Sequence, residues 1–138
     1  MIEVRDLTKD YGPRRAINKL NFTINKGEVV GLLGPNGAGK STTMKIITGF
    51  MAPSSGLATI AGFDVFESPL EVKKRIGYLP ETPPIYTDMY VRDYLTYVAE
   101  LKQVPQDKIK TQVQGALEKT NLLGVEKRLI HNLSKGYR

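Results

Sequence analysis

The chain has 138 residues and a formal net charge of +6 at pH 7, with 20 Lys and Arg against 14 Asp and Glu. It contains no cysteine, which excludes a disulfide framework and a thiolate metal site. No run of about eighteen apolar residues is present, so no segment is expected to span a bilayer. Its cations are scattered, and the densest groups, at 14–15 and 73–75, lack interleaved aromatic residues for base stacking. A solvated basic surface is favoured over nucleic-acid binding, and no nucleic-acid partner is expected.

The first third of the chain predicts strands. Residues 2–8 and 20–24 alternate between apolar and polar side chains, and a turn is expected at residues 11–13. Residues 28–33 are apolar at both alternations, which predicts a strand buried on both faces, as in a parallel sheet. The sequence therefore predicts an antiparallel β-layer attached to a parallel core.

Residues 34–42 follow this third strand and match the phosphate-binding pattern G-x-x-x-x-G-K-[ST]. Glycine at three loop positions leaves the inner surface free of side chains, so that backbone N–H groups can converge on a polyphosphate. A helix is expected to begin near Lys40 and to end at Gly49, and its N-terminus adds unpaired N–H groups and positive dipole charge. Its apolar face is expected to comprise Met44, Ile46, Ile47 and Phe50.

Two residues of this loop have expected roles toward phosphate and metal. Lys40 would place a point charge near the β- and γ-phosphates, and Ser41 would offer its hydroxyl to Mg²⁺. The alternative is a glycine-rich turn that matches the pattern by chance. The order strand, loop, helix favours the phosphate site.

Shorter elements are predicted in the middle of the chain. Residues 57–60 and 76–79 are expected to be short strands. Ser68 resembles an N-cap before Pro69, which suits the first position of a helix reaching residue 75. Prolines at 80, 83 and 84 predict an extended segment.

The last third changes to helical periodicity. Apolar residues between 91 and 101, and again between 109 and 117, recur at helical spacing, with a break at Pro105. Two amphipathic helices in a small helical layer are expected.

With these motifs in this order, the sequence resembles the ATP-binding subunit of an ABC transporter over its whole length. Residues 133–138, Leu-Ser-Lys-Gly-Tyr-Arg, resemble the signature motif of that family, usually Leu-Ser-Gly-Gly-Gln. Lys135 and Tyr137 depart from the usual Gly and Gln, which leaves the contact at Tyr137 undefined. The variants at 79–81 and 133–138 are similar to bacterial exporters of multidrug, sodium, copper or gliding-motility systems.

The resemblance implies an α/β fold: a P-loop NTPase core with an antiparallel β-layer and a helical subdomain, truncated before the Walker B strand. Residues 1–85 would form the N-terminal part of the core and residues 86–138 the helical subdomain ending in the signature motif. ATP and Mg²⁺ are the implied cofactors. Catalytic roles would fall to Lys40 and Glu81, and metal contacts to Ser41 and Glu81. The implied nucleotide-binding residues are Tyr11, Gly34, Asn36, Gly37, Ala38, Gly39, Lys40, Ser41, Thr42, Ser134 and Gly136.

Several of these residues have an ordinary structural alternative. Tyr11, which the family uses to stack on adenine, can be a plain turn aromatic. Glu81, at the place of the family's Q-loop glutamine, either senses nucleotide or caps a turn. Ser134 either caps the next helix or binds the γ-phosphate of ATP held by a partner subunit, and both roles suit a helix N-terminus. His131 precedes the signature motif, so it is expected to be a surface or loop residue and not the family's switch histidine.

The resemblance also implies an assembly and an activity. Complete subunits would form a head-to-tail homodimer on transmembrane permease subunits, cytoplasmic and peripheral at the inner face of the cell membrane, with ATP hydrolysis energising transport. The chain is expected to be an N-terminal portion without the Walker B and switch-histidine segments, so that it binds nucleotide without efficient hydrolysis and has weak stability alone. The alternative is a non-transport ABC ATPase of translation or DNA repair, which long insertions in the helical layer would favour.

Overall fold

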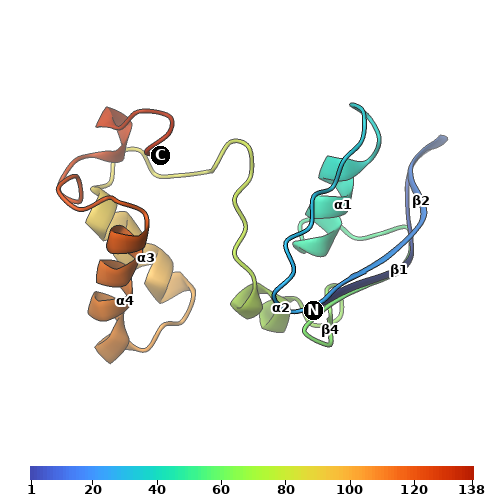
Figure 1. The fold of residues 1–138 in the computed structure, drawn as a ribbon, viewed down its shortest axis with the longest axis horizontal. Helices are drawn as coiled ribbons and strands as arrows, with labels where there is room; N and C mark the ends of the chain where they lie inside the picture. Colours follow the sequence, from blue (N-terminus) through green and yellow to red (C-terminus); the bar gives the residue numbers. More distant parts are fainter. The chain divides into compact units, whose positions relative to one another are not determined.

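The structure is a computed structural model that describes residues 1–138. The chain divides into two compact units, Met1–Leu79 and Pro80–Arg138, which Figure 1 colours from blue to green and from yellow to red. The division at residue 79 falls shortly before residue 85, where the sequence placed the end of the ATPase core. The assignment of those two parts as core and helical subdomain stays a prediction.

The first unit contains one antiparallel sheet. Its strands are β1 (Ile2–Tyr11), β2 (Arg14–Ile24), β3 (Ser55–Ile60) and β4 (Phe63–Asp64), in the order β2-β1-β3-β4. The strands predicted at 2–8, 20–24 and 57–60 are confirmed, and β1 and β2 meet at the expected turn. The sequence did not predict β4.

Strand β2 begins six residues before its predicted start, because irregular pairing interrupts the apolar–polar alternation on which the prediction relied. The β1–β2 register shifts between Val4 and Leu7 and again between Leu7 and Lys9, and Asp6 in the first shift and Lys19 in the second each have a positive φ of 45°. The Asn21 side-chain oxygen accepts the Asp6 N–H at 2.8 Å, so the displaced backbone keeps a partner. Strict alternation is therefore lost along the pair, although the hydrogen-bonded strands continue to Tyr11 and Arg14.

Two helices complete the first unit. Helix α1 (Lys40–Ile47) begins directly after the glycine loop, as predicted, and the chain turns at Gly49, where φ is 75°. Ile46 and Ile47 are buried against the sheet, whereas Met44 and Phe50 of the predicted apolar face are 41% and 71% exposed. The face is therefore narrower than predicted.

The second helix of this unit follows its sequence signals in part. Helix α2 (Pro69–Arg75) has Ser68 at its N-cap and proline at its first position, as expected, but the Ser68 side chain makes no capping hydrogen bond. The buried residues of the first unit form one core: Val4, Leu7, Ile17, Ile46, Ile47, Ala58, Ile60, Val65 and Val72.

The strands predicted at 28–33 and 76–79 are wrong for this structure. Neither segment has strand conformation, and Val29, Leu33 and Leu79 are 101%, 93% and 79% exposed. A strand persists when a neighbour pairs with its N–H and C=O groups, and no strand within residues 1–138 lies beside either segment. The predicted burial of residues 28–33 is wrong as well, because no element of residues 1–138 covers them.

The second unit is helical, as predicted. Helices α3 (Val91–Leu101) and α4 (Gln106–Lys119) pack side by side, and the short 3₁₀ helix η1 (Ile130–Asn132) follows (Figure 1). Their buried core comprises Val91, Ile109, Val113, Leu117, Ile130 and Leu133.

Backbone hydrogen bonds tie the end of the chain to the start of α3. The Ile130 N–H donates to the Met89 carbonyl and the His131 N–H to the Thr87 carbonyl, both at 2.9 Å. Leu133 is buried immediately afterwards. The final residues 134–138 therefore begin at a position that hydrogen bonds and a buried side chain hold on the helical unit.

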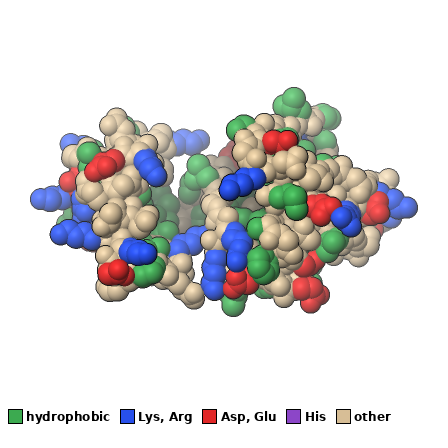
Figure 2. Space-filling view, turned by 60° about the horizontal axis from the view of Figure 1, so that its bottom comes forward, with side chains coloured by type: hydrophobic (Ala, Val, Ile, Leu, Met, Phe, Trp, Pro, Cys, Tyr) green, Lys and Arg blue, Asp and Glu red, His purple; other side chains and the backbone are tan.

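The surface carries both signs of charge. Figure 2 shows Lys and Arg side chains in separate groups among Asp and Glu on the visible face. None of the helices is both long enough and apolar enough to traverse a membrane.

Candidate phosphate-binding site

The position of the glycine loop is set by a close approach to β2. Gly39 forms the N-cap of α1 in the left-handed region, with φ 89°. A Cβ atom at this position would lie 2.4 Å from the Ala16 carbonyl oxygen, which no side chain tolerates. Glycine is therefore required at Gly39 by its positive φ and by its close approach to a strand, which differs from the predicted reason, a loop surface free of side chains.

Lys40 directs its ammonium group into the curve of the loop. Its Nζ donates hydrogen bonds to the carbonyl oxygens of Gly34, at 2.6 Å, and Pro35, at 2.8 Å. On the next turn Thr43 is 2% exposed, and its hydroxyl donates to the Gly39 carbonyl at 3.0 Å. These contacts place a positive charge at the centre of the loop and fix the first turn of α1.

The start of α1 also presents unpaired donors. The first intrahelical bond of this turn runs from the Thr43 N–H to the Gly39 carbonyl, at 2.8 Å. The N–H groups of Lys40, Ser41 and Thr42 therefore have no acceptor within the helix. Together with the positive end of the helix dipole, they form a surface that favours an anion.

A cavity of about 350 Å³ joins this loop to the hairpin of β1 and β2. The residues that line it include seven of the predicted nucleotide-binding residues, brought together from two regions of the sequence. The full lining is Tyr11, Arg14, Ala16, Asn36, Gly37, Gly39, Lys40, Ser41 and Thr42. Gly34 and Ala38 belong to the loop but not to the lining.

Tyr11 lies at the mouth of this cavity. Its ring is 45% exposed, its hydroxyl donates to the Met51 sulfur at 3.1 Å, and the Lys9 ammonium lies 5.6 Å from the ring centroid. The ring is therefore held in place beside the loop with an accessible surface. Its role toward adenine stays a prediction.

A larger cavity, of about 550 Å³, lies between the end of α1 and the β3–β4 region. The charged side chains that line it are Asp64 and Glu67, and it has no Lys or Arg. A polyphosphate would meet repulsion there and attraction at the glycine loop. Chemistry therefore selects the smaller cavity as the phosphate site.

Three predicted site residues, Glu81, Ser134 and Gly136, belong to the second unit, and their surroundings are described within that unit. Glu81 is exposed in the proline-rich segment before α3. Ser134 and Gly136 are exposed in a turn, where the Ser134 hydroxyl accepts the Tyr137 N–H at 3.4 Å and its carbonyl accepts the Arg138 N–H at 3.1 Å. The turn is accessible, as its expected role requires.

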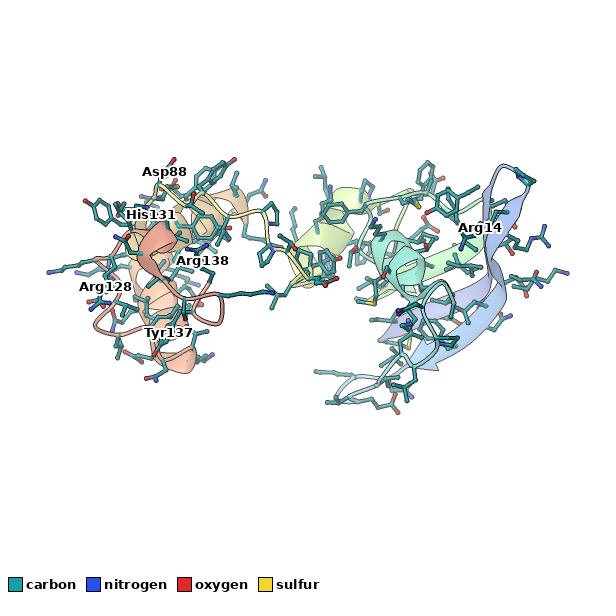
Figure 3. The ribbon with its side chains drawn as sticks, turned by 90° about the horizontal axis from the view of Figure 1, so that it is seen from above. Arg14, Asp88, Arg128, His131, Tyr137 and Arg138 are labelled. Atoms are coloured by element: carbon teal, nitrogen blue, oxygen red, sulfur yellow. The ribbon has the colours of Figure 1, made fainter.

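His131 is exposed in η1, which confirms its assignment as a surface residue. Its carbonyl accepts a hydrogen bond from the Arg138 guanidinium, and Figure 3 shows both residues in this part of the helical unit. Two residues that line the phosphate cavity were missed by the sequence reasoning: Arg14 and Ala16. Their only signal was a place just after Tyr11 in a hairpin.

Comparison with known proteins gives one consistent result. A sequence model of the family described as "ABC transporter" matches residues 17–138. The ABC transporter ATP-binding protein NatA of Bacillus subtilis is 35% identical over 144 residues, covering 100% of this chain and 58% of NatA. The bacitracin transport ATP-binding protein BcrA of Bacillus licheniformis is 33% identical over 136 residues, covering 99% of this chain and 44% of BcrA.

Solved structures agree. A structure described as the ATP binding subunit of an ABC transporter has a TM-score of 0.87 at 30% identity, covering 97% of this chain and 56% of that one. For cbiO1 of Clostridium perfringens the TM-score is 0.82 at 27% identity, covering 96% and 55%. These matches confirm the predicted fold class. The chain spans less than two thirds of the length of each of these relatives.

Proposed function

Because the chain belongs to the ABC transporter family, we propose that residues 34–42 bind ATP, and that the protein uses its hydrolysis to energise transport across a membrane. The observation that carries this proposal is the cavity in which the Lys40 ammonium, the N–H groups of the first turn of α1 and the Tyr11 ring converge. Relatives with transport in their names support it and do not favour a role in translation or DNA repair.

Lys40 has donor capacity left for a phosphate. An ammonium group carries three N–H donors, and two are directed at the carbonyls of Gly34 and Pro35. The third can reach an anionic oxygen while the other two keep the side chain in place. Lys40 would thereby stabilise the charge of the transferring phosphoryl group without reorganising.

The residues present fit Mg²⁺ bound mainly through nucleotide and water. No group of three or more His, Cys, Asp or Glu side chains gathers to hold a metal ion. The exposed Ser41 hydroxyl is a hard oxygen donor in the cavity lining, as Mg²⁺ prefers. Ser41 would hold the ion, which when bound neutralises phosphate charge. The role of Glu81 toward the ion stays a prediction.

Hydrolysis requires more than the lining provides. No carboxylate lines the cavity, so none of these side chains can act as a general base for the attacking water. Residues 1–138 would therefore bind nucleotide with little turnover by themselves, and efficient ATPase activity would belong to the full-length protein.

The second half of each ATP site would come from another copy. The exposed Ser134–Gly136 turn offers a hydroxyl and a backbone N–H to the γ-phosphate of ATP on the partner, in a head-to-tail homodimer. Permease subunits in the membrane would bind the dimer and place it at the inner face of the cell membrane. The cbiO1 structure is described as part of the ABC transporter complex cbiONQ, which supports such an assembly.

Calorimetric titration of the full-length protein with MgATP tests the binding step. Lys40→Ala should weaken binding by about tenfold or more, because it removes a charged donor from the centre of the loop. Lys45→Ala is the matched control, since Lys45 is exposed on the same helix and outside the cavity lining. Equal binding by wild type and Lys40→Ala would contradict the proposal.

Disulfide formation tests the dimer. Residues 1–138 contain no cysteine, so Asn36→Cys and Lys135→Cys introduce the only thiols of this region. A full-length double variant should form an intermolecular disulfide that depends on ATP, and each single variant should not form that heterologous bond. Cross-linking that ATP does not alter would count against the shared site.

A further inference from the structure

Arg14 lies between Tyr11 and the phosphate-binding loop, which are the two parts of the candidate nucleotide site in the first unit. It is the first residue of β2 and the cross-strand partner of Tyr11, and it lines the same cavity as Lys40. Its Nη2 atom lies 3.7 Å from the point where a Cβ of Gly37 would be. The guanidinium of Arg14, labelled in Figure 3, thus reaches from the hairpin to the tip of the phosphate-binding loop.

The neighbouring arginine behaves differently. The Nε of Arg15 lies 2.8 Å from Asp10 Oδ1, and this hydrogen bond, with the attraction of the carboxylate, raises the pKa of Arg15 above its usual value. The side chain of Arg14 forms no hydrogen bond or ion pair with any residue in 1–138. Since no carboxylate lines the cavity, the charge of Arg14 remains unneutralised beside the loop.

We propose that Arg14 is a further nucleotide-binding residue, whose guanidinium donates hydrogen bonds to the phosphate chain of the bound nucleotide. This inference rests on the proposed function. A guanidinium presents five N–H donors in a planar fork that matches phosphate oxygens, whereas Lys40 spends two of its three donors on the loop. Arg14 therefore supplies the larger number of uncommitted donors.

The place of Arg14 gives it a selective effect. It stands on the hairpin with Tyr11, the proposed base contact, but its charged end lies at Gly37 of the phosphate loop. It should therefore favour ATP and ADP over adenosine, which offers no anionic oxygen. The contact should also weaken with salt, because Arg14 is exposed.

The test compares Arg14→Gln with Arg15→Gln in the full-length protein. Affinities for MgATP and ADP are measured by calorimetry, and affinity for adenosine by competition with a fluorescent ADP analogue. Arg14→Gln should weaken ATP and ADP binding by about tenfold and leave adenosine binding unchanged. Arg15→Gln should change all three by less than about twofold, since an exposed ion pair contributes little.

Other results would overturn the inference. Unchanged ATP affinity in Arg14→Gln, or an equal loss for ATP and adenosine, would show that Arg14 does not contact phosphate. Arg14→Lys keeps the positive charge and should therefore keep part of the ATP affinity at low salt. This variant distinguishes loss of the charge from a general loss of folding. Failure of the wild-type protein to bind ATP would instead refute the proposed function itself.

Discussion

Gly39 links the backbone of the phosphate-binding loop to the sheet. Its positive φ and its contact with the Ala16 carbonyl leave no space for a side chain. The loop is therefore positioned by the hairpin that also carries Tyr11, although more than twenty residues separate the two segments in sequence. The geometry of the site depends on this one close approach.

Replacement of Gly39 by alanine should be costly. Left-handed backbone costs an L-residue about 1–2 kcal/mol, and the 2.4 Å contact must also be relieved, so we expect a loss of about 2 kcal/mol or more in the free energy of unfolding. Gly31→Ala is the control, because nothing lies within 4 Å of a Cβ there. Denaturant unfolding followed by circular dichroism measures both. Equal stability of the two variants would contradict this account.

Glu71 should contribute to the acid limb of stability. Hydrogen bonds from Arg75 and Lys74, with the charge of Lys74, lower the pKa of Glu71 below its usual 4.5. A lowered folded pKa means that the contribution is present above pH 4.5 and is lost as pH falls through the folded value. In the full-length protein, the melting temperature of Glu71→Gln should therefore lie below that of the wild type at neutral pH and approach it under acid conditions. A difference that stays constant with pH would refute this assignment.

At the scale of elements, α4 contributes Ile109, Val113 and Leu117 to the core of the helical unit. Leu117 is 0% exposed and lies in the core that α3, α4 and η1 share. Leu101, at the end of α3, is 63% exposed. Replacement of leucine by alanine can therefore be compared at a buried position and at an exposed position of the same unit.

Leu117→Ala should reduce the stability of the helical unit by about 2–5 kcal/mol, because it removes buried methyl groups and leaves a cavity. Leu101→Ala should change it by less than about 0.5 kcal/mol. Hydrogen exchange of amides in α4 reports this unit directly. Similar exchange in both variants would show that Leu117 is not a core residue.

The elements show where sequence reasoning succeeds and where it stops. The helices α3 and α4 were predictable because their periodic apolar residues, such as Val91 and Ile109, are close in sequence and pack in the same core. Residues 28–33 carry an equally clear apolar pattern, but a strand needs a neighbour, and residues 1–138 provide none. The local apolar pattern therefore identifies segments that are suited to burial, but it does not show whether a neighbouring element is present to bury them.

The site divides in the same way. The loop at 34–42 was predictable because its chemistry lies in nine consecutive residues with a known spacing. Arg14 was not, because its meaning depends on the hairpin that brings its guanidinium to Gly37. The bulge at Asp6 was equally hidden, since it follows from the pairing of β1 with β2.

At the scale of the whole chain, apolar residues at 28–33 lie exposed. Val29 and Leu33 are almost fully accessible, and the backbone around them has no strand partner. Such a segment can pair with the same segment of another molecule. We therefore expect the polypeptide of residues 1–138 to self-associate and to lack a cooperative thermal transition at high temperature.

Charge substitutions test this expectation. The double variant Val29→Lys and Leu33→Lys should shift the 1–138 polypeptide toward monomer, as measured by analytical ultracentrifugation. Leu101→Lys places a charge at another exposed leucine and should leave association unchanged. Equal effects at both places would indicate general charge repulsion, and a monomeric wild-type polypeptide would rule out association through 28–33.

The central claim is that backbone amides of the loop and of the first turn of α1 enclose a phosphate chain. The most direct measurement is the change in backbone amide chemical shifts when the isotope-labelled full-length protein is titrated with MgATP. The largest changes should fall on residues 37 and 39–42. Largest changes at Gly49, Gly56 and Val65, which line the other cavity, would contradict the claim.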